Sequence, residues 1–131
     1  MAKYIIEVDD EQADIILNSL EFYARILIGQ WQEIGYHCLD LRDEDYVHKF
    51  DCLKKGLGAL RPFAFPDLPP NLDSSYGVTS RPIPCRAWEI YTTIRHKLAW
   101  NRHPEGGITV DFGRPISYSG KPLPKCEVID N

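Results

Sequence analysis

The sequence has no segment that predicts a membrane anchor or a secretory leader. It contains no run of about 18 apolar residues, the length that a membrane-crossing helix needs. Its first ten residues, MAKYIIEVDD, hold too short an apolar run for a signal peptide, and acidic residues follow at once. We therefore expect a protein of the cytoplasm with no membrane partner.

Motifs that mark common catalytic and metal-binding sites are also missing. The sequence has no G-x-S-x-G elbow, Walker loop, H-E-x-x-H pair or paired-carboxylate motif. The cysteines include no Cys-x-x-Cys pair, which argues against a zinc ribbon or a redox motif; they are Cys38, Cys52, Cys85 and Cys126. His96 and His103 share a helix face and could act as acid or base, but surface or capping roles are commoner. We predict a non-enzyme with no catalytic residue, metal or cofactor.

The net charge of −4 is unevenly divided along the 131 residues. Residues 1–53 carry 12 acidic against 4 basic side chains, whereas residues 54–131 carry 7 against 11. This balance argues against binding of long nucleic acid. It leaves open a local anion site in the second half, and equally a role in docking two subunits or two faces.

The first half predicts one short strand followed by two helices. Residues 4–8 (YIIEV) are apolar and β-branched, as in a strand. Asp9 and Gln12 have the spacing of a capping box, and apolar residues then recur at helical steps over residues 10–36. Gly29 lies inside that stretch, either to let another helix pack closely or as a tolerated weak point. A second apolar stripe predicts a helix that Gly56 and Gly58 end.

A proline-rich loop separates this half from the next. Residues 61–84 hold six of the ten prolines, which remove amide donors and block helices. Beyond the loop we predict a helix over residues 86–101, a half-buried strand over residues 108–112 and an edge strand over residues 121–129. The expected architecture is a single α+β domain over residues 1–131, with two or three helices packed on a small antiparallel β-sheet.

The last helix and the segment after it gather groups that suit a nucleotide. Arg86, Arg95, Arg102 and Arg114 could pair with phosphate oxygens, and several aromatic rings could stack on a base. Asn101 and Asp111 could hydrogen-bond to a base edge or a ribose hydroxyl. A salt-bridged, solvated face with the aromatic rings in the core would explain the same residues, and the sequence leaves both interpretations open.

The overall layout resembles a family of small phage proteins, the Thoeris anti-defence 1 family. The segments that carry this resemblance are LEFYARILIGQWQEI, SSYGV, AWEIYTTIRHKLAWNRHPEGGITVDFGRP and PLPKCEV, which together span nearly the whole chain. The resemblance implies a non-catalytic sponge in the host cytoplasm, one that binds cyclic ADP-ribose isomers made by bacterial TIR-domain enzymes. It also implies dimers or hexamers, and a separate site for cyclic oligonucleotides in some members.

The resemblance assigns roles to individual residues of this sequence. It implies that Tyr91 stacks on adenine and that Asn101 bonds the base or the ribose. By their chemistry, Asp111 would bond a ribose hydroxyl and the cationic side chains would bind the phosphates. The predicted ligand-binding set is Tyr91, Arg95, Asn101, Arg102, Asp111, Arg114 and Lys121.

The acidic first half suggests an alternative function. It could imitate nucleic acid and let a phage protein inhibit a host defence enzyme by direct protein–protein binding. The acidic residues alternate with the apolar stripe of the first helix, however, so a solvated helix face explains them more simply.

Overall fold

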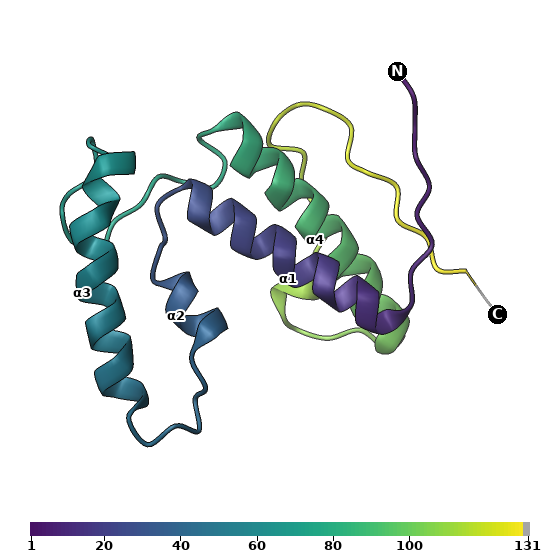
Figure 1. The fold of residues 1–131 in the computed structure, drawn as a ribbon. Coiled ribbons are helices and arrows are strands. Elements are labelled where there is room, and N and C mark those ends of the chain that lie inside the picture. The colour runs from purple at the N-terminus through teal and green to yellow at the C-terminus, as the bar shows by residue number, and fades with distance from the viewer. Residues whose placement is uncertain (130–131) are drawn as a thin grey trace.

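The computed structural model describes residues 1–129 and contains helices but no strand within that range, so the predicted α+β fold is wrong. Within these residues the chain forms four α-helices and one short 3-10 helix, which Figure 1 shows in order along the chain. Their bounds are α1 (Asp10–Leu27), α2 (Glu33–Cys38), α3 (Tyr46–Ala64), α4 (Pro82–Arg102) and η1 (Val110–Phe112). There is consequently no sheet for the helices to pack on.

The first helix begins as predicted but ends early. The Asp9 carboxylate accepts from the Gln12 amide at 2.8 Å, and the Gln12 side chain accepts from the Asp9 amide at 3.0 Å, which completes the capping box. The predicted continuation to Tyr36 is wrong because α1 ends at Leu27. Gly29 takes φ +90°, a left-handed value that stops the helix and sends the chain into α2.

The α1–α4 pair forms the main packed unit of the protein. The two helices lie side by side along most of their length (Figure 1). Small residues let them approach closely, since Ala13, Ala24 and Ala87 are all buried in the core. The predicted helix over residues 86–101 is confirmed, although it starts earlier because Pro82 suits the first helical turn.

A buried arginine joins α3 to the rest of the molecule. α3 lies apart from α1 and α4 in Figure 1, with α2 between. The predicted helix end at Gly56 and Gly58 is wrong, since α3 continues to Ala64. Near that end Arg61 is 0% exposed, and its guanidinium donates to backbone carbonyls of four residues; these are Gly29 (2.9 Å), Ser74 (2.6 Å), Pro69 (2.6 Å) and Asn71. Arg61 thereby fixes both the turn after α1 and the irregular part of the proline-rich segment, residues 65–81.

Two of the predicted strands are exposed, irregular segments instead. Residues 4–8 leave their apolar side chains in solvent, with Ile5 95% exposed, and residues 121–129 carry Pro122 and Pro124, which lack amide donors. A strand needs a neighbour to pair its backbone groups. No such neighbour exists among residues 1–129, so β-propensity alone does not produce a strand here.

The third predicted strand is a tight turn because tertiary contacts override its alternating pattern. The amide of Phe112 donates to the Thr109 carbonyl at 3.2 Å, which closes the 3-10 turn of η1. Ile108 is 104% exposed and Val110 75% exposed, so the side of the pattern that we expected to be buried faces solvent. The Phe112 ring instead packs edge-on against Trp100, with centroids 5.4 Å apart.

None of the helices within residues 1–129 combines the length and the apolar character that crossing a bilayer requires.

Candidate functional site

A groove of about 400 Å³, which we name the α4 groove, lies where α1, α4 and η1 meet. Its apolar lining comes from Leu17, Leu98, Ala99 and Phe112. Its polar lining comes from Arg95, Arg102, His103, Thr109 and Asp111. Three members of the predicted ligand-binding set, Arg95, Arg102 and Asp111, therefore line one concavity.

Arg95 lies in this groove with its guanidinium contacted from two directions. Its Nε is 3.1 Å from Asp111 Oδ1. On the other side, its guanidinium carbon is 4.9 Å from the centroid of the Tyr91 ring, and its Nη1 donates to the Tyr91 hydroxyl at 3.3 Å. The side chain is 21% exposed. The charge of Arg95 is thus positioned by an aromatic face and balanced by a carboxylate.

Arg102 lies two turns further along α4 and ties that helix to the start of α1. Its Nη1 donates to Asp14 Oδ1 at 3.0 Å, and its Nη2 is 3.5 Å from Asp10 Oδ1. The hydrogen bond to Asp14 and the two negative charges outweigh partial burial and raise the pKa of Arg102 above its ordinary value. Arg102 therefore stays charged, and more of its side chain reaches solvent than for Arg95.

Tyr91 belongs to the α1–α4 interface and is only 7% exposed. Its ring lies 4.9 Å from Trp88, centroid to centroid, and the Arg95 guanidinium lies over it. Burial is the largest influence on the Tyr91 hydroxyl and raises its pKa. In this arrangement Tyr91 positions Arg95, and its ring faces protein groups.

The remaining predicted residues lie outside the α4 groove. Asn101, Arg114 and Lys121 are all exposed and do not line it. The Lys121 amide donates to Ser119 Oγ at 3.2 Å, which places its backbone in the turn at residues 117–121. The structure brings together Arg95, Arg102 and Asp111, with Tyr91 packed against Arg95. Asn101, Arg114 and Lys121 do not belong to this group.

Two glycines and Trp100 set the position of η1, which carries Asp111. Gly106 takes φ +82°, and a Cβ on Gly107 would lie 2.4 Å from the Phe112 ring. The indole Nε1 of Trp100 donates to the Phe112 carbonyl at 3.1 Å. The turn after α4 is thereby folded back on the helix, so that Asp111 reaches Arg95.

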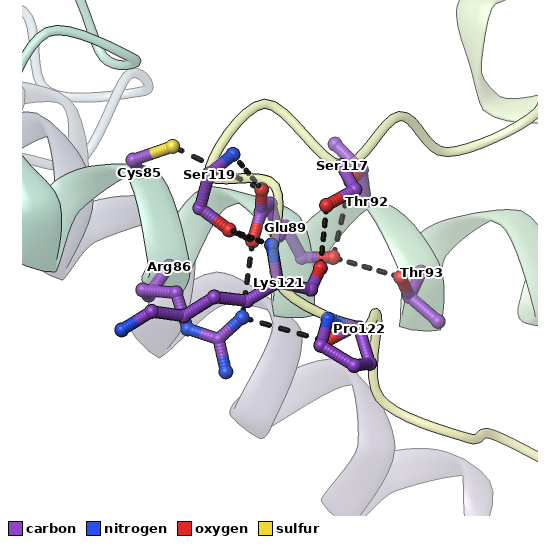
Figure 2. A network of polar contacts seen from close by, with 9 residues as sticks. All are labelled: Cys85, Arg86, Glu89, Thr92, Thr93, Ser117, Ser119, Lys121 and Pro122. Carbon is purple, nitrogen blue, oxygen red and sulfur yellow. Dashed lines mark hydrogen bonds and ion pairs between the residues drawn. The ribbon is translucent and has the colours of Figure 1, made fainter.

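Sequence reasoning missed Glu89, the buried carboxylate that fastens the C-terminal segment to α4. It is 1% exposed, and Figure 2 shows its carboxylate between Ser119 and Arg86. The Ser119 amide donates to Oε2 at 2.8 Å and the Ser119 hydroxyl donates to Oε1 at 2.8 Å. Arg86 Nη1 lies 3.4 Å from Oε1 and also 3.4 Å from the Pro122 carbonyl. No local pattern in the sequence links Glu89 to a serine thirty positions later.

The charge on Glu89 is maintained by these contacts. Burial alone would raise the pKa of the carboxyl, but the two Ser119 hydrogen bonds and the Arg86 charge outweigh it and lower the pKa. Glu89 is a structural anchor that lies away from the α4 groove residues.

A search of residues 1–129 finds no group of three or more His, Cys, Asp or Glu side chains arranged to hold a metal ion.

Comparison with protein-family models, with curated proteins and with solved structures returned no match for this chain.

Proposed function

We propose that this chain is a phage anti-defence protein that binds a cyclic nucleotide immune signal in the host cytoplasm and sequesters it without cleavage. The proposed ligand is a cyclic ADP-ribose isomer, and cyclic oligonucleotides are a second ligand class. The observation that carries the proposal is the α4 groove, which is lined by two arginines and by several apolar side chains.

The chemistry of the α4 groove suits a phosphate joined to an apolar ring system. Guanidinium groups bind phosphate oxygens through paired, charge-assisted hydrogen bonds, here from Arg95 and Arg102. The apolar side chains that line the groove, including Leu98 and Phe112, offer a surface for a base. A sponge needs a dissociation constant below the concentration of the signal, and nanomolar binding corresponds to about −12 kcal/mol.

Retention of the ligand tests this proposal directly. The protein is incubated with cyclic ADP-ribose isomers, desalted and heated, and the released nucleotide is analysed by mass spectrometry. We expect the isomer to be retained and released intact. Release of an altered nucleotide would instead indicate an enzyme, and no retention would contradict the proposal.

Arg102 offers a site-specific variant for the same measurement. Arg102→Gln should weaken retention by about tenfold to a hundredfold, because a charge-assisted contact contributes about 1.5–3 kcal/mol. Arg42→Gln is the matched control, since Arg42 pairs with Asp40 at the surface and lies outside the α4 groove. Equal loss in both variants would show that the ligand responds to overall charge and not to this groove.

A second candidate function is inhibition of a host defence enzyme by protein–protein contact. The observation that favours it is a pair of exposed apolar side chains one turn apart near the C-terminal end of α3, Leu60 and Phe63, of which Phe63 is 89% exposed. Exposed apolar residues gathered on one element are typical of an interaction surface. No retention of nucleotide, together with loss of enzyme inhibition in a Phe63→Ser variant, would favour this alternative.

The proposal includes self-association as a dimer or a hexamer. The N-terminal segment supports it, because Tyr4, Ile5 and Ile6 are all more than three-quarters exposed. Consecutive apolar side chains of this kind gain free energy when a second surface covers them.

A further inference from the structure

We infer that Asp111 is an internal competitor for the ligand: its carboxylate takes the place on Arg95 that a ligand phosphate must occupy. This inference rests on the proposed function, since it concerns the same groove. It reverses the role expected from the sequence, in which Asp111 assists binding through a ribose hydroxyl. A ligand phosphate would then have to displace the Asp111 carboxylate from Arg95 before it could bind in the α4 groove.

The surroundings of Arg95 leave the Asp111 side as the approach for an anion. The Tyr91 ring covers one face of the guanidinium at 4.9 Å, and the Tyr91 hydroxyl accepts from Nη1. Asp111 Oδ1 lies 3.1 Å from Nε. Asp111 lines the α4 groove and Tyr91 does not, so a phosphate that pairs with Arg95 from the groove meets the carboxylate first.

The contact between Arg95 and Asp111 is an imperfect one that a phosphate can replace. Although the atoms are 3.1 Å apart, the buried Nε of Arg95 has no aligned hydrogen-bond acceptor. A buried donor that lacks an aligned partner carries a free-energy cost. A phosphate can present two oxygens to one guanidinium in paired geometry, and so could satisfy the donor that Asp111 leaves unsatisfied.

The carboxylate is carried by an element that can release it. Asp111 is 41% exposed and lies in η1, a turn of three residues. Its Oδ2 accepts from the Thr109 hydroxyl at 3.2 Å, within the same turn. Water can therefore solvate the Asp111 carboxylate once it leaves Arg95.

Calorimetric titration with inorganic pyrophosphate tests the inference on the full chain. Asp111→Asn keeps the shape of the side chain and removes its charge, so we expect pyrophosphate to bind about two- to fivefold more tightly than to the wild type, the gain from removing one partly exposed competing pair. Asp73→Asn is the charge-matched control, because Asp73 lies beside Lys54 in a different part of the molecule, and it should leave binding unchanged.

Each outcome decides the inference. Unchanged or weaker binding in Asp111→Asn, or no detectable binding of pyrophosphate to that variant, overturns it. An equal gain in Asp73→Asn also overturns it, because net charge would then explain the effect. Circular dichroism and the thermal midpoint establish that each variant is folded. The proposed function is judged separately, by retention of intact cyclic ADP-ribose isomers in the wild type.

Discussion

Glu89 shows how a single buried charge can hold an otherwise irregular segment. Between η1 and residue 129 the C-terminal segment has no helix, and it passes across α4 as an irregular chain (Figure 1). Its attachment at Ser119 uses both the amide and the hydroxyl of that residue. Removing one partner of such a contact leaves the other buried without a hydrogen-bond partner, which typically costs about 1–3 kcal/mol.

Replacement of Glu89 by Gln should make the free energy of unfolding less dependent on pH in the acidic range. The folded-state pKa of Glu89 lies below its ordinary value of 4.5, so the carboxylate stabilises the fold above that pH and loses this contribution as the pH falls through the lowered value. We expect Glu89→Gln to lower the free energy of unfolding by about 1–2 kcal/mol at neutral pH. The difference from the wild type should shrink below about pH 4.5, as measured by thermal unfolding across pH 3–7.

Glu127→Gln provides the control for that series. Glu127 lies in the same C-terminal segment and pairs with Lys125 at 3.1 Å, but both side chains are largely exposed. Its substitution should change stability by less than about 0.5 kcal/mol. A Glu89→Gln deficit that stays constant down to pH 3 would show that the charge of Glu89 is not what fastens the segment.

At the scale of elements, glycine positions decide where the first half turns. Gly29 occupies a left-handed conformation, and a Cβ there would lie 2.7 Å from the Leu68 side chain. Gly29→Ala should therefore destabilise the protein by roughly 2 kcal/mol, through backbone strain and overpacking. Chemical denaturation measured by far-UV circular dichroism gives this difference.

Gly56→Ala is the matched comparison within α3. A Cβ at Gly56 meets nothing within 4 Å, and the residue is helical. The same change of side chain should here stabilise the protein by up to about 1 kcal/mol, because alanine favours the helix. A Gly29→Ala variant that is as stable as the wild type or more stable would contradict the assignment of Gly29 as the stop of α1, whereas destabilisation by Gly56→Ala would contradict only the expectation for Gly56.

The helices that could be predicted from the sequence are those with local signals. The capping box at Asp9 and Gln12 and the apolar periodicity of α4 depend on neighbours in sequence, and both are confirmed. The three strands could not be judged locally, because a strand exists only with a partner. In the same way Gly29 reads as a helix interior position until its contact with the loop at Leu68 is known.

The site could be anticipated only in part, for the same physical reason. Arg95, Arg102 and Asp111 were predicted as members of one ligand-binding set, and all three line the α4 groove. Arg102 is about ninety positions away in sequence from Asp10 and Asp14, so no local sequence pattern predicts that they pair. The burial of Tyr91 and Glu89 likewise depends on which segments cover α4.

The whole molecule exposes more surface than a self-sufficient monomer of its size. Its accessible area is 9562 Å² for a mass of 15.1 kDa, whereas a compact monomer of that mass exposes about 7,100 Å². The surplus, about 2,500 Å², is on the scale that obligate homodimers bury. The buried core is correspondingly small, with seven apolar residues in the described part of the chain.

We therefore expect self-association in solution, measured by sedimentation velocity or light scattering at micromolar concentration. Replacement of Ile5 and Ile6 by Thr should shift the protein toward the monomer, because these exposed side chains would no longer gain from being covered. Replacement of Ile108 by Thr, on an equally exposed turn, tests whether any surface isoleucine has this effect. A wild type that is monomeric at all concentrations would contradict the expectation.

The hydrogen bonds of Arg61 also allow the middle of the chain to fold early during synthesis. Every carbonyl that Arg61 binds belongs to a residue between Gly29 and Ser74, so all of them leave the ribosome before α4 does. α1 by contrast packs mainly on α4, which is completed only at Arg102. The contacts of Arg61 can thus form first, whereas the apolar face of α1 stays exposed to solvent until α4 has been synthesised.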